Sequence, residues 1–103
     1  KQIKSKFLIL PKLEKHKKSV YHLFVVRINK KLRTRFINYL KSNKIVCGIH
    51  YPIPNHKQKP FQKFKSDLYV TEMISKEIIS LPIYPMLKFN EVSNIIKLIN
   101  NFK

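Results

Sequence analysis

The stretch SVYHLFVVRI, Ser19 to Ile28, decides the fold class. It is rich in β-branched and aromatic residues and is long enough to form a well-buried strand rather than half of a helix. We therefore expect it to be the central strand of a sheet. Within it, His22 alternates onto the same face as Phe24 and Val26, which favours a hydrogen-bonded core histidine.

Two further strands and a helix are predicted around this stretch. Phe7–Leu10 is a short apolar run that predicts a strand, and the charged residues 12–18 after it predict a loop. Leu32–Lys44 repeats apolar residues at three- and four-residue spacing, which predicts a helix, with Asn43 in the left-handed turn that ends it. Ile45–Tyr51 then predicts a strand that a proline stops.

The second half of the chain predicts a stiff loop and two helices. Residues 51–61 contain three prolines, which fix the backbone without making it regular, as suits a loop that holds side chains toward a ligand. Val70–Ile79 has helical spacing, with Asp67 or Thr71 as a possible cap. Asn90–Phe102 also places its apolar residues along one helical face.

These elements define one domain over residues 1–103. Leu81–Pro85, bracketed by prolines, predicts a very short edge strand or extended connector between the last two helices. The order is then β, β, α, β, loop, α, β, α. We expect an α+β fold, with a small, mostly antiparallel sheet covered on one face by helices in a two-layer sandwich.

The formal net charge of +17 raises the possibility of a freestanding basic nucleic-acid-binding module. Phe7, Tyr21, Phe24 and Phe61 could stack on bases, but no recognisable binding motif is present. The basic residues are almost all lysines, and they are spread along the whole chain. We therefore interpret most of the charge as solvated surface that can help attract an anionic ligand, and we expect no specific nucleic-acid binding.

Composition excludes several other functions. One glycine leaves no phosphate-binding glycine loop, and the five acidic residues are too scattered for paired-carboxylate chemistry. A metal site at His50 and His56 would need a third ligand, which we do not find.

Cys47, the single cysteine, is interpreted as core packing in a cytoplasmic protein. No apolar run is long enough to cross a membrane, and we expect no membrane partner.

Three blocks resemble the small domain of DegT-type sugar aminotransferases. They are SVYHLFVVRI, GIHYPIPNHKQKPF from Gly48 to Phe61, and TEMISKEIISLPIYPML from Thr71 to Leu87. They occur in the family's order and, with the last helix, span most of the chain. The chain departs from the family pattern at Val46 and Cys47, and at the start of the last helix, where Asn90 is a substitute cap.

The resemblance implies a fold-type I enzyme that depends on pyridoxal phosphate. Such an enzyme transfers an amino group from an amino acid, typically glutamate, to a nucleotide-linked keto-sugar, and works as a homodimer. None of the lysines here matches the lysine that binds the cofactor, so no catalytic residue is assigned to this chain. We expect a C-terminal small domain that closes the substrate side of the active site, inactive without a large cofactor-binding domain.

The site residues follow from the proline-braced loop. We expect His50, Tyr51 and His56 to hydrogen-bond sugar or diphosphate oxygens, with Lys57 and Gln58 as weaker candidates. The alternative is that His50 and Tyr51 finish a strand and only pack. Arg27 is a weak candidate for binding the donor's carboxylate, because bidentate arginine is the usual partner of carboxylates, but an arginine near the end of a strand more often reaches solvent.

Overall fold

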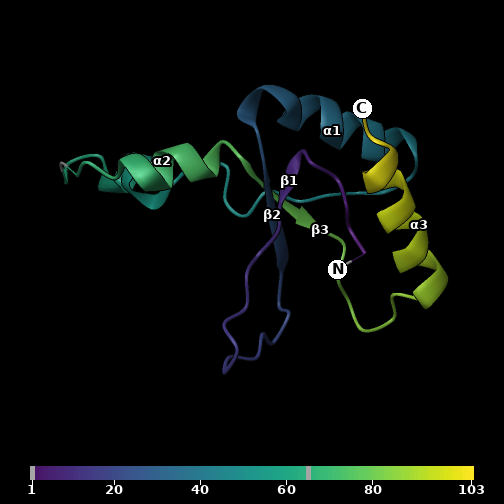
Figure 1. Ribbon diagram of the computed structural model, residues 1–103. Coiled ribbons are helices and arrows are strands. Elements are labelled where there is room, and N and C mark those ends of the chain that lie inside the picture. The colour runs from purple at the N-terminus through teal and green to yellow at the C-terminus, as the bar shows by residue number, and fades with distance from the viewer. Residues whose placement is uncertain (1, 65) are drawn as a thin grey trace.

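The computed structural model describes residues 2–64 and 66–103, which form a three-stranded antiparallel sheet and three α-helices (Figure 1). The elements in chain order are β1 (Leu8–Ile9), β2 (Phe24–Ile28), α1 (Lys30–Ser42), the 3₁₀ turns η1 (Asn55–Lys57) and η2 (Lys59–Phe61), α2 (Tyr69–Ser75), β3 (Ile78–Leu81) and α3 (Phe89–Asn101). The predicted α+β class is confirmed, and the central strand is β2, as expected.

The sheet has the order β1-β2-β3, and its register sorts the side chains onto two faces. Val26 is paired with Ile79, and Phe24 with Leu81. Because alternate residues of a strand point to opposite faces, these four side chains lie on one face together. Arg27 and its partner Ile78 lie on the other.

The core lies between the first of these faces and two helices. Phe36 and Leu40 of α1 and Ile99 of α3 are fully buried, and they belong to one hydrophobic cluster with Val26 and Ile79. Figure 1 shows α1 and α3 on this side of the sheet, while α2 extends away from it together with the 3₁₀ turns. Only two of the three helices therefore cover the sheet, and α2 stands apart.

The strand predicted for residues 19–28 is too long. Only Phe24–Ile28 is paired, because Tyr21 takes a left-handed backbone conformation with φ of 50°, which breaks the extended chain. The prediction of His22 as a core residue is wrong for the same reason: it precedes the strand and is exposed.

The strand predicted for Ile45–Tyr51 is reduced to a single bridge. Gly48 exchanges both backbone hydrogen bonds with Ser80, at 3.0 and 2.8 Å, and the chain then leaves the sheet. The prolines that follow lack the N–H that a ladder needs, so pairing ends there. Cys47 is half-buried against the core, as predicted, and burial raises the pKa of its thiol to about 11.

The helix predicted for Val70–Ile79 and the strand predicted for Leu81–Pro85 are displaced. The helix ends at Ser75, and Ile78 and Ile79 belong to β3, where they pair with β2. Tertiary pairing outweighs helical spacing here, and the prolines after Leu81 form no strand. Neither Asp67 nor Thr71 caps α2, because its N-cap is Leu68 without a side-chain bond.

The other two helices were predicted within two residues at each end. α1 ends at Ser42 with Asn43 as its C-cap, but Lys44, with φ of 64°, is the residue in the left-handed conformation. α3 begins after Lys88, whose backbone N–H donates to the Glu91 carboxylate at 2.7 Å, so the cap predicted at Asn90 is wrong.

Candidate functional site

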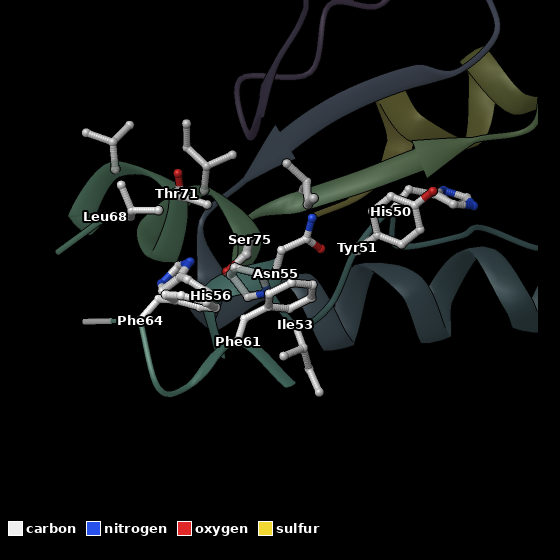
Figure 2. Close-up of a pocket in the computed structure, with 14 residues that line it drawn as sticks. His50, Tyr51, Ile53, Asn55, His56, Phe61, Phe64, Leu68, Thr71 and Ser75 are labelled. Carbon is white, nitrogen blue, oxygen red and sulfur yellow. The ribbon is translucent and has the colours of Figure 1, made fainter. Parts of the chain in front are cut away.

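A cavity of about 610 Å³ lies between the proline-braced loop, α2 and the start of β3. Figure 2 shows side chains from these segments around it. Most of its wall is apolar, formed by Ile53, Pro54, Phe61, Phe64, Leu68, Val70, Ile74 and Ile78. Its polar lining comes from His50, Tyr51, Asn55, His56, Thr71 and Ser75. An apolar cleft with a few placed polar groups is typical of a ligand-binding site.

His50 is held at this cavity by the edge of the sheet. Its Nδ1 lies 2.9 Å from Oγ of Ser80, a buried residue of β3, and the two atoms share a hydrogen bond. The imidazole also lies so close to Gly48 that a Cβ there would be 2.6 Å from His50 Cε1. The single glycine of the chain therefore makes room for the ring. Among the described residues, Nε2 of His50 has no hydrogen-bond partner.

Tyr51 lies beside this histidine and is largely exposed. The two rings meet edge to face, with centroids 5.8 Å apart and planes at 82°. Tyr51 lines the cavity while 70% of it stays accessible to solvent. The loop therefore places a histidine and a phenol side by side at the cavity.

His56 and Lys57, from η1, converge on one carboxylate. His56 Nε2 donates to Oε1 of Glu72 at 3.1 Å, and Lys57 Nζ lies 3.0 Å from the same oxygen. The hydrogen bonds from Lys57 and then from His56 lower the pKa of Glu72 below its ordinary value, so it is ionised at neutral pH. His56 lines the cavity, whereas Lys57 does not.

Gln58 and Arg27 lie outside the cavity wall. The Gln58 amide donates to Ile53 O and Asn55 Oδ1, both at 3.4 Å, and so braces the loop from within. Arg27 Nε and Nη2 donate to Oε2 of Glu77 at 3.1 and 2.7 Å. The Arg27 guanidinium is therefore already paired with a carboxylate of its own chain.

Sequence reasoning missed three partners of these residues: Glu72, Glu77 and Ser80. All three lie inside the quoted block from residue 71 to 87. Only Ser80, between Ile79 and Leu81, carried a signal in the sequence, a polar residue within an apolar run. The contacts of all three depend on how the chain folds back, which no spacing in the sequence reveals.

The residues described here do not form a pyridoxal phosphate site. A Schiff base requires a lysine in the site, yet every described lysine is exposed and none lines the cavity. No group of three or more metal-ligating side chains occurs among residues 2–64 and 66–103. In the same part of the chain, no helix has the length and apolar character to span a membrane.

Comparison with known proteins identifies the family. The model of the DegT/DnrJ/EryC1/StrS aminotransferase family matches residues 2–100. The chain belongs to this family. It is 40% identical over 101 residues to dTDP-3-amino-3,6-dideoxy-alpha-D-galactopyranose transaminase from Aneurinibacillus thermoaerophilus, an alignment that covers 97% of this chain and 27% of that protein. The predicted resemblance to DegT-type aminotransferases is therefore confirmed.

Solved structures of larger proteins contain this fold. A DegT DnrJ EryC1 StrS aminotransferase from Brucella abortus superimposes with a TM-score of 0.83 at 24% identity, covering 90% of this chain and 25% of that one. NtdA from Bacillus subtilis, with bound cofactor PMP, gives 0.78 at 22% identity, covering 91% and 22%. The chain thus spans about a quarter of the length of the proteins it matches.

Proposed function

We propose that this chain is the C-terminal small domain of a pyridoxal-phosphate-dependent aminotransferase that acts on a nucleotide-linked keto-sugar, with glutamate as amino donor. The observation that carries the proposal is the 40% identity to a dTDP-sugar transaminase, which extends over 97% of the chain. The cofactor and its lysine would belong to a large domain outside this segment, and the complete enzyme would be a homodimer. The 103 residues alone would be inactive.

In this proposal the cavity between the loop and α2 forms part of the sugar side of the active site. His50 Nε2 and the Tyr51 hydroxyl can donate to sugar or diphosphate oxygens, because neither has a partner among the described residues. Ser80 fixes the His50 ring, so the side chain loses less conformational entropy when the ligand binds. The cofactor supplies the electron sink, while these residues bind and orient the sugar and exclude water.

The test uses the full-length enzyme with the amino sugar that the A. thermoaerophilus relative is named for, dTDP-3-amino-3,6-dideoxy-α-D-galactopyranose, and 2-oxoglutarate as acceptor. His50→Phe and Tyr51→Phe keep the rings and remove the hydrogen-bonding groups. We expect a higher KM for the amino sugar in both variants. The matched control is His16→Phe, in an exposed loop away from the cavity. Wild-type KM and turnover in both cavity variants would refute the assignment.

A further inference from the structure

The carboxylate of Glu72 joins two parts of the chain that share no other hydrogen bond or ion pair among residues 2–64 and 66–103. Residues 52–64 form the outer wall of the cavity, and Glu72 lies on α2 across from them. Within residues 2–64 and 66–103, every other recorded hydrogen bond of the 52–64 segment stays inside the segment. The bonds from His56 and Lys57 to Glu72 are thus its polar tether to the rest of the domain.

Burial differs between the two arms of this tether. The His56 side chain is 10% exposed, whereas that of Lys57 is 52% exposed. A hydrogen bond to a carboxylate is stronger where water is excluded, and exposed ion pairs contribute little. The bond from His56 is therefore the better shielded from water, although the bond from Lys57 has the larger effect on the pKa of Glu72.

Glu72 also decides which ring nitrogen of His56 is free. A carboxylate can only accept, so Nε2 carries a proton and points at Glu72. Nδ1 has no partner among the described residues, while the ring itself lines the cavity. Orientation of one ring nitrogen by a carboxylate is how many proteins present the other nitrogen to a ligand.

We propose that Glu72 is a positioning residue of the sugar site: it holds residues 52–64 against α2 and presents Nδ1 of His56 to the bound nucleotide sugar. It does not itself touch the ligand, because it is absent from the cavity wall, where no acidic side chain occurs among the described residues. The proposal rests on the function proposed above. It extends that function to a residue that only the folded chain brings to the loop.

The experiment separates positioning from general damage by using two amines on one enzyme. Glutamate and dTDP-3-amino-3,6-dideoxy-α-D-galactopyranose would each convert the cofactor of the full-length enzyme from its aldehyde to its amine form, and cofactor absorbance reports both reactions. In Glu72→Ala we expect the concentration of amino sugar needed for half-maximal rate to rise by about tenfold, since a misplaced binding group weakens substrate positioning. The rise should be smaller in Glu72→Gln, because the amide oxygen can still accept from His56. The glutamate reaction should stay within about twofold of wild type.

The control is Glu14→Gln, which removes the same charge from an exposed ion pair with Lys17, 2.8 Å away and remote from the cavity. Both reactions should match wild type in this variant. A parallel loss of the glutamate and sugar reactions in the Glu72 variants would show a purely structural role and overturn the proposal. Unchanged sugar dependence would overturn it as well.

Hydrogen exchange tests the tether without a substrate. In Glu72→Ala the amides of residues 52–64 should exchange faster, because the segment loses its polar link to α2, while Glu14→Gln leaves them unchanged. Unaltered exchange would overturn the tether. If the wild-type enzyme reacts with neither dTDP- nor UDP-linked amino sugars, the proposed function fails, and the exchange result still decides whether Glu72 holds the loop.

Discussion

Truncating Val26 and Val20 to alanine removes the same two methyl groups from two very different places. Val26 is in the middle of β2, has no exposed surface and is paired with Ile79. Val20 lies four residues before β2 and is 92% exposed. Both belong to the stretch, residues 19–28, that its β-branched and aromatic residues predict to be a single strand. The pair therefore tests where the strand begins.

The expected losses follow from burial. Two buried methyl groups contribute about 1.6 kcal/mol of transfer free energy, at about 0.8 kcal/mol each. The cavity left beside Ile79 and the core helices adds to this, so we expect Val26→Ala to lower the free energy of unfolding by about 2.5 kcal/mol. Val20→Ala should change it by less than about 0.5 kcal/mol, as usual for an exposed site.

Urea denaturation of the 103-residue chain, followed by circular dichroism, measures both values. With a slope of about 2 kcal/mol per molar urea, Val26→Ala should shift the midpoint by about 1 M. The slopes must stay equal for the midpoints to be compared. Similar losses in the two variants would show that residues 19–23 are buried as well, and would refute the shorter strand.

Two further predictions concern charge and thiol chemistry. Glu77→Gln should lower the free energy of unfolding by about 1 kcal/mol, because Arg27 loses its counter-charge in a partly exposed pair. Urea titrations in 1 M NaCl should show a smaller difference from wild type, because salt screens the pair. Below pH 9, Cys47 should react with Ellman's reagent about a hundredfold more slowly than in the urea-unfolded chain, because burial raises its pKa from 9.0 to about 11. Since the folded state favours the protonated thiol, stability should fall as pH rises through 9 to 11.

Local patterns were enough to predict the element types over much of the chain. The apolar spacing of residues 32–44 and 90–102 led to α1 and α3, and the β-branched run led to β2. These elements bury a continuous face, so their sequence carries the periodicity of the structure they adopt. The same reasoning failed at Ile78 and Ile79, whose spacing fits a helix but which pair with β2.

The candidate site was predicted in part. The proline-rich loop and its residues His50, Tyr51 and His56 do meet at one cavity, while Lys57 and Gln58 brace the loop. The carboxylate that orients His56 and the hydroxyl that holds His50 were not foreseen. Both come from later segments that return to the loop only in the folded chain.

The amino-acid sequence by itself determined the family, the α+β class, the central strand and the loop that lines the cavity, because these depend on residue type and short-range spacing. Only the tertiary structure decided where β2 and β3 begin, that α2 leaves the sheet, and which carboxylate each cation meets. Those outcomes depend on contacts between residues 16 to 57 positions apart, such as His56 with Glu72 and Phe24 with Leu81. Pairing and burial over such separations outweigh local preference, and no local pattern records them.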